Sequence, residues 1–105
     1  MNHQISGEVL TVKFAGEIDI SNLETIDGYV SGFFDGKKEI VFDFDEVYYI
    51  DSAGLSYLLK CDRTIRRTGR FLAIRNLFGQ VKRIFEVSGV NEHLTTADTQ
   101  NIPNL

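Results

Sequence analysis

The sequence predicts an α/β fold with a mostly parallel central sheet and helices packed against it. Three observations carry this prediction: strand-like and helix-like stretches alternate after an initial pair of strands, the strand-like stretches are short and apolar, and most helical stretches stop at glycine. Strands that alternate with helices pair in parallel through right-handed crossovers. The expected order is β-β-α-β-α-β-α-β, in a single domain over residues 1–105.

The first elements expected are a hairpin and a helix. Residues 4–6 and 8–16 alternate apolar and polar side chains on either side of a short turn, which is typical of antiparallel strands. Residues 21–24 have the form of a capping box, and apolar side chains then recur at helical spacing. The first helix is therefore expected over about residues 22–35, with Gly36 as its stop.

The rest of the chain alternates strands and helices. The sequence predicts a strand at 39–44, a helix from about 53 to 69, a strand at 70–76 and a helix from 77 to 88. A final short strand is expected around His93 and Leu94. The tail, residues 95–105, has no apolar period and is expected to be loose.

Composition indicates an ordinary globular protein with a net charge of −4. Residues 1–51 hold three basic and eleven acidic residues, whereas residues 52–105 hold eight and four. This division favours oriented docking over nucleic-acid binding, although both halves could simply solvate their own surfaces. A single cysteine excludes an internal disulfide, and the N-terminus lacks the features of a signal peptide. We expect a cytoplasmic protein.

No enzyme constellation is evident. His3 and His93 have no partner at metal-ligand spacing, no phosphate-binding glycine loop is present, and Cys61 is expected to be a buried small hydrophobe. We expect neither a metal nor a cofactor.

Four carboxylates near the carboxyl end of the 39–44 strand form a group that could hold Mg²⁺ or make a phospho-acceptor pocket. Asp43 and Asp45 are expected on one face of the strand, and Glu46 and Asp51 in a turning loop. Solvated loop acids are the commoner interpretation of such a group.

The loop before the second helix carries the residue of most interest, Ser52. Asp51 or Ser52 is expected to cap the helix. Asp51 alone could supply the cap, which makes the adjacent hydroxyl of Ser52 partly redundant, and small Ala53 and Gly54 leave its surroundings open. A phosphate there would add about −1.5 to −2 charges at a helix N-terminus, which tolerates anions. The residues themselves allow both a cap and a charge switch.

At this loop the sequence resembles a known family. "VFDFDEVYYIDSAGLSYLL" resembles the signature of STAS domains, and in particular of the stand-alone anti-sigma factor antagonists (anti-anti-sigma factors) of bacteria. "LTVKFAGEIDISN" and "RFLAIRN…VKRIFEVSGV" are similar to two further motifs of that family, in the correct order. The resemblance covers nearly the whole chain and implies a STAS fold.

The resemblance implies a binding switch that is not an enzyme. In such proteins the serine after aspartate is phosphorylated by a serine kinase that is also an anti-sigma factor. The unphosphorylated form binds that kinase and frees the sigma factor, and a metal-dependent phosphatase resets the switch. By position, Ser52 is the phosphorylation site and Asp19 belongs to an adjoining docking loop. The implied partner-binding residues are Asp19, Asp51, Ser52, Ala53, Gly54 and Leu55.

Two departures from the family pattern matter. Many relatives carry two hydroxyl residues in this loop, but Ala53 leaves Ser52 as the only one, with Ser56 a turn along. A final helix common in the family has little support in residues 95–105. Two alternatives stay open: a STAS scaffold or transporter-associated module that is not phosphorylated, and a small phosphatase or nucleotide hydrolase that uses the acid group.

Two helix features have no assigned function. Gly28, Gly32 and Gly36 recur every four residues on the side of the first helix opposite its apolar side chains, where they could form a merely weak exposed face or admit a partner backbone. Asp62 falls within the apolar side of the second helix and is expected to pair with Arg66 or to lie where the helix overhangs the sheet.

Overall fold

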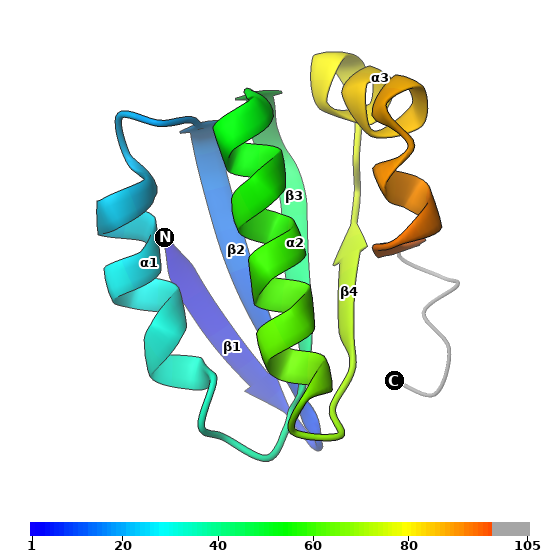
Figure 1. Ribbon diagram of the computed structural model, residues 1–105. Helices are drawn as coiled ribbons and strands as arrows, with labels where there is room; N and C mark the ends of the chain where they lie inside the picture. Colours follow the sequence, from blue (N-terminus) through cyan, green and yellow to red (C-terminus); the bar gives the residue numbers. More distant parts are fainter. Residues whose placement is uncertain (98–105) are drawn as a thin grey trace.

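The computed structural model describes residues 1–97 and has a mixed α/β architecture, as predicted (Figure 1). The strands, in sheet order, are β1 Asn2–Ser6, β2 Val9–Ile18, β3 Glu39–Ile50, β4 Leu72–Arg75 and β5 Thr95–Ala97. The helices are α1 Leu23–Val30, α2 Ser52–Arg66 and α3 Gly79–Ser88, with short 3₁₀ turns η1 Ser31–Phe33 and η2 Val90–Glu92. β1 and β2 are antiparallel, and every other neighbouring pair is parallel.

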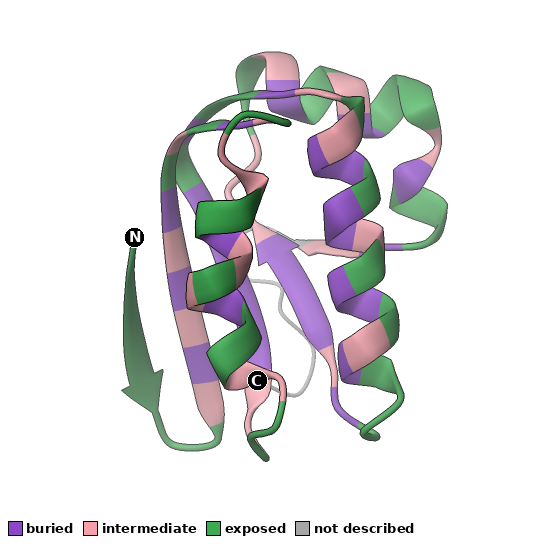
Figure 2. Ribbon diagram, turned by 60° about the vertical axis from the view of Figure 1, so that its left-hand side comes forward, coloured by how far each residue is buried: buried purple, intermediate pink, exposed green. Residues whose placement is uncertain are grey.

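Helices α1 and α2 lie side by side on one face of the sheet (Figure 1). Their buried residues point toward the strands, and their exposed residues point away (Figure 2). The centre of the core is aromatic: the ring of Phe14 lies 4.8 Å from that of Phe42 and 5.2 Å from that of Phe44, between centroids. These side chains are fully buried, so this layer fixes α2 over the central strands.

No helix among residues 1–97 is long and apolar enough to cross a membrane.

Strand β3 is twice as long as the predicted strand at 39–44. Its register against β2 shifts twice, so that β3 carries an extra residue at each shift. Each extra residue is a β-bulge, which is why the buried residues Phe42, Phe44, Val47 and Ile50 are spaced by two, three and three. A strict period of two therefore ends at Phe44, and the prediction ended there with it.

Helix α1 is shorter than predicted and lacks the predicted capping box. Asn22 occupies the N-cap position without a side-chain capping bond, and the Ser21 hydroxyl donates instead to Asp19 Oδ1 at 2.5 Å. The helix tightens into η1 and ends at Phe33. The buried guanidinium of Arg70 explains this end, because it donates to the main-chain oxygens of Phe33, Phe34 and Lys38.

The C-terminal elements differ from prediction by a few residues. Helix α3 begins at Gly79 rather than residue 77. The last strand is Thr95–Ala97 rather than a strand at His93 and Leu94, so residues 95–97 are not loose. They pair in parallel with β4, so their main-chain groups form hydrogen bonds with a strand distant in sequence. The composition of the tail does not indicate such pairing. The remainder of the tail, residues 98–105, lies outside the described residues.

Candidate docking site around Ser52

Asp51 is the N-cap of α2 and also joins two loops. Its Oδ1 atom accepts a hydrogen bond from the Gly54 amide at 2.8 Å, which is the capping bond. Its Oδ2 atom accepts from the Ile20 amide at 3.1 Å, in the loop between β2 and α1. The Asp51 amide donates to the Ile18 carbonyl oxygen at 3.3 Å. Of the two predicted cap candidates, the structure therefore uses Asp51.

Ser52 is the first residue of α2 and is exposed. Its hydroxyl makes no hydrogen bond to any other group of residues 1–97. Because Asp51 supplies the cap, the hydroxyl is available for chemistry at a helix end whose dipole favours negative charge. Ser56, one turn further along, is also exposed.

Gly54 and Leu55 lie beneath the surface at this helix start. A Cβ atom on Gly54 would lie 2.6 Å from the Ile18 carbonyl oxygen and 2.6 Å from Ile50 Cγ1, so only glycine fits there. Leu55 is buried in the core. These two residues therefore hold α2 against the ends of β2 and β3. The other predicted site residues, Asp19, Asp51, Ser52 and Ala53, are exposed or partly exposed.

The adjoining loop is held in one conformation by its own side chains. Asp19 Oδ1 accepts from the amide of Ser21 at 3.0 Å as well as from its hydroxyl. Asn22 accepts from the Asp19 amide at 3.0 Å and donates to the Glu17 carbonyl oxygen at 2.7 Å. These Asx-type bonds tie the loop to the end of β2. They leave the side chain of Ile20 74% exposed beside the Asp51 loop.

Sequence reasoning missed two residues of this end of the molecule. Ile20 has no assigned role in the sequence analysis, although the polar residues that flank it indicate an exposed loop. Gln80 on α3 accepts from the Ile50 amide at 3.1 Å and donates to the Ile50 carbonyl oxygen at 3.0 Å. Its amide thus acts as a strand neighbour for the last residue of β3, a pairing that no local pattern reveals.

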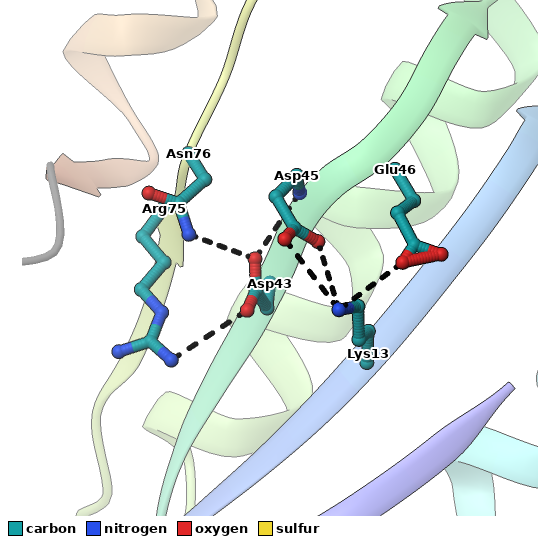
Figure 3. Close-up of polar contacts among 6 residues, drawn as sticks. All are labelled: Lys13, Asp43, Asp45, Glu46, Arg75 and Asn76. Atoms are coloured by element: carbon teal, nitrogen blue, oxygen red, sulfur yellow. Dashed lines mark hydrogen bonds and ion pairs between the residues drawn. The ribbon is translucent and has the colours of Figure 1, made fainter.

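The four carboxylates do not form one group. Glu46 lies within β3, not in a loop, and Asp51 belongs to the α2 cap described above. Asp43, Asp45 and Glu46 lie on the face of the sheet turned away from α2 (Figure 3). These three acids therefore lie apart from the Ser52 surface, and an interpretation of them as its rim is wrong.

Each of these three carboxylates forms an ion pair with a lysine or arginine, and Asp43 also accepts a hydrogen bond from an amide group. Lys13 Nζ lies 3.4 Å from Asp45 Oδ1 and 3.1 Å from Glu46 Oε2, and these hydrogen bonds, that of Glu46 first, raise the pKa of Lys13. The Asp43 carboxylate accepts from Asn76 Nδ2 at 3.0 Å and lies 3.6 Å from Arg75 Nη2 (Figure 3). Within residues 1–97, no group of three or more His, Cys, Asp or Glu is arranged to hold a metal ion.

The polar residues in the middle of α2 are structural. Cys61 is buried, as predicted, and burial raises the pKa of its thiol to about 12. Asp62 pairs with Arg66, also as predicted, with 2.9 Å between Oδ2 and Nε. The hydroxyl of Tyr57 donates to Asp27 Oδ1 at 2.8 Å and so ties α2 to α1. These three side chains therefore serve the packing of α2.

Comparison with known proteins matches the STAS domain family model to residues 1–101. The chain belongs to the STAS domain family. This STAS domain is 24% identical over 82 residues to an anti-sigma-B factor antagonist of Staphylococcus aureus, an alignment that covers 77% of this chain and 76% of the relative.

Solved STAS structures share the fold. A Thermotoga maritima protein provisionally named an anti-sigma factor antagonist superposes with a TM-score of 0.85 at 22% identity, over 93% of this chain and 86% of that one. The Bacillus cell fate determinant SpoIIAA in its phosphorylated form superposes with a TM-score of 0.68 at 20% identity, over 94% and 92%. The murine anion transporter Slc26a9 contains a similar domain, with a TM-score of 0.74 at 22% identity over 85% of this chain and 15% of the transporter.

Proposed function

We propose that this STAS domain is an anti-sigma factor antagonist that is switched by phosphorylation of Ser52. One observation carries the proposal: Asp51 caps α2 by itself, and the neighbouring hydroxyl is exposed and has no hydrogen-bond partner within residues 1–97. The curated relatives named as anti-sigma factor antagonists support it. In this proposal the unphosphorylated protein binds an anti-sigma factor that is also a serine kinase, and the sigma factor is released.

The docking surface proposed for that partner combines the Ser52 end of α2 with the loop after β2. Asp51 holds the two segments together through the Ile20 amide. Ile20 contributes an exposed apolar side chain, and the partly exposed Asp19 contributes a carboxylate. A small apolar contact beside charged groups is typical of a specific, reversible protein interface.

Phosphorylation would act on this surface through charge. A phosphate on Ser52 adds about −1.5 to −2 charges next to Asp51, and the α2 dipole offsets part of the cost within the folded protein. The fold therefore stays intact, while a partner surface that accommodates a neutral hydroxyl faces a clustered negative charge. This favours release of the partner by repulsion and desolvation rather than by a conformational change.

The proposal assigns no catalysis to the domain itself. The kinase acts on Ser52 from outside, a metal-dependent serine phosphatase removes the phosphate, and both reactions take place in the cytoplasm. The hydrolase alternative loses support because its acids are paired with Lys13, Arg75 and Asn76 on the other side of the sheet.

Two serines one turn apart allow a matched experiment. The protein is incubated with the anti-sigma factor kinase of its source organism and ATP, and phosphate is located by mass spectrometry. We expect phosphate on Ser52, its loss in Ser52→Ala, and no effect of Ser56→Ala. Ser52→Asp is expected to weaken kinase binding by about tenfold or more, equal to ~1.4 kcal/mol, whereas Ser56→Asp leaves it unchanged. Phosphate on another residue, or equal affinities of the two aspartate variants, would refute the switch.

A second candidate is a scaffold or transporter-associated module that is not phosphorylated. The similarity of the fold to the domain of Slc26a9 favours it. Affinity capture from cells of the source organism separates the two functions, because recovery of membrane transport components by wild type and Ser52→Asp alike supports the scaffold. Recovery of a kinase by wild type only supports the switch.

A further inference from the structure

The sheet has a second buried surface, on the face turned away from α2. The buried apolar residues of all three helices belong to one cluster on the helix side of the sheet. Val41 of β3 and Ala73 of β4 are 1% and 0% exposed, yet within residues 1–97 they are the two buried apolar residues outside that cluster. The helices therefore do not account for the burial of this pair.

The strand register places both residues on the far face. Val41 pairs with Ala73, and Asp43, two positions later in β3, lies on the face turned away from α2 (Figure 3). Side chains two positions apart in a strand share a face. The neighbours of the pair in the adjacent strands are the short side chains of Thr11 and Thr95. These neighbours flank the pair within the sheet and leave its outer side to another segment.

Two polar atoms on this face are also buried. Arg75 Nε and Glu39 Oε2 have no hydrogen-bond partner among residues 1–97. Arg75 is two positions after Ala73, and Glu39 is two positions before Val41, so both share the face of the buried pair. Buried polar groups almost always have a partner. A segment that covers this face therefore needs both a hydrogen-bond acceptor and a donor.

We propose that residues 98–105 lie across this face and cover Val41 and Ala73. β5 ends at Ala97, which pairs with Arg75, so the chain leaves the sheet at the edge of the same face. β3 is two strands away from β5, a distance of about 10 Å. Eight extended residues reach up to about 28 Å. The 98–105 segment is therefore long enough to cross β4 and β3.

The composition of the 98–105 segment, "DTQNIPNL", matches what the face lacks. Ile102 and Leu105 supply apolar side chains to pack on the buried pair. The aspartate and amide oxygens of the segment can accept from Arg75 Nε, and its amide and hydroxyl groups can donate to Glu39. A segment tethered at the edge of the face is also present there at high effective concentration, which favours it over a second copy or another protein.

The proposal does not depend on the phosphorylation switch. Ser52 begins α2, on the opposite side of the sheet from Val41. The segment also needs no helical or strand-like apolar period to pack in this way, since a few apolar side chains are enough to cover two small residues. The absence of such a period in the sequence is therefore compatible with a packed segment.

Methyl nuclear Overhauser effects in the full-length protein test the proposal. We expect contacts from the methyl groups of Ile102 and Leu105 to those of Val41. Val12 is the control, because it is fully buried in the cluster on the helix side and should show none. Absence of the Val41 contacts would overturn the proposal. In a mixture of labelled and unlabelled copies, contacts found only between copies would mean that a second chain covers the face, and would overturn it as well.

A mutant cycle in the full chain measures the same contact through stability. Val41→Ala is expected to raise the equilibrium constant for unfolding by about tenfold in an otherwise wild-type chain. In a chain that carries Ile102→Asn and Leu105→Asn, the effect of Val41→Ala should be smaller by about threefold or more. Val12→Ala is the control and should have the same effect in both chains.

Urea unfolding followed by circular dichroism gives the four constants of each cycle. Equal effects of Val41→Ala in the two chains would contradict a contact between Val41 and the 98–105 segment. If the asparagine variant fails to fold, the nuclear Overhauser contacts of the wild-type protein still decide the matter.

Discussion

Asp51 and Ile20 are 31 positions apart in sequence, yet the carboxylate of one accepts a hydrogen bond from the amide of the other at 3.1 Å. The same carboxylate caps α2 through Gly54. One side chain thus fixes the helix start and the neighbouring loop in a single arrangement, and the docking surface proposed around Ser52 depends on it.

Loss of the Asp51 carboxylate is expected to destabilise the protein. Asp51→Ala removes the N-cap and the tie to Ile20, so the free energy of unfolding should fall by ~1–2 kcal/mol. Urea unfolding followed by circular dichroism measures this change. Ser52→Ala is the control and should change stability by less than ~0.5 kcal/mol. Equal losses in the two variants would mean that Ser52 shares the cap.

Gly54 is expected to tolerate no larger residue. A methyl group there meets the Ile18 carbonyl oxygen and Ile50 Cγ1, each at 2.6 Å, so Gly54→Ala should lower the free energy of unfolding by ~1–3 kcal/mol. Gly28→Ala is the matched control, because nothing lies within 4 Å of its Cβ position on α1. That change should stabilise the protein by up to ~1 kcal/mol. The opposite signs are read from thermal or urea unfolding, and a stabilising Gly54→Ala would contradict the close approach of α2 to β2.

Gln80 is expected to hold the end of β3 through two hydrogen bonds of opposite sense. Gln80→Glu keeps the shape but loses the donor to the Ile50 carbonyl oxygen, so it should destabilise the protein by ~1–3 kcal/mol near neutral pH. Hydrogen exchange at the Ile50 amide gives a local measurement. Glu86→Gln on the exposed side of α3 is the control. Unchanged stability and exchange in Gln80→Glu would show that the pairing contributes nothing.

The free energy of unfolding is expected to fall in alkaline solution. Burial raises the pKa of Cys61 from 9.0 to about 12 and raises the pKa of Tyr57 as well. Between about pH 9 and 12 the unfolded chain has lost the thiol proton that the folded chain keeps, so stability falls as pH rises, by up to ~1.4 kcal/mol per pH unit.

Urea unfolding of wild type and Cys61→Ala at about pH 8 and 10.5 tests this dependence. The variant lacks the thiol and should lose ~1–2 kcal/mol less than wild type over that range. Parallel declines in the two proteins would argue against a contribution from the thiol. Labelling by a thiol reagent should also be slow in the folded protein and fast in urea.

Arg70 is expected to contribute more to the free energy of unfolding than any surface arginine. Its guanidinium bonds to three carbonyl oxygens at the end of η1 and before β3, and to Thr68 Oγ1 at 2.8 Å. Arg70→Met leaves those groups without donors and should cost about 2–3 kcal/mol of stability. The exposed Arg83 provides the control as Arg83→Met, with a change within ~0.5 kcal/mol. Similar effects of the two changes would refute the role of Arg70.

Local patterns in the sequence were enough for the element types, their order and the class of fold. Apolar spacing predicted α2 and α3 within a few residues, because the face of a helix that packs on a sheet must be apolar every third or fourth position. The family resemblance, carried by short motifs at element ends, agreed with the family match over residues 1–101. The pairing of Asp62 with Arg66 was also local, four residues apart on one helix.

Only the tertiary structure decided what depended on contacts between distant segments. The bulges of β3 arise from its register against β2, and the pairing of Thr95–Ala97 depends on β4. The sequence likewise left open whether Asp51 or Ser52 caps α2, because either side chain could cap an isolated helix. The position of the Ile20 loop makes Asp51 the cap. One oxygen of Asp51 accepts from the Gly54 amide and the other from the Ile20 amide, and the hydroxyl of Ser52 stays exposed to solvent.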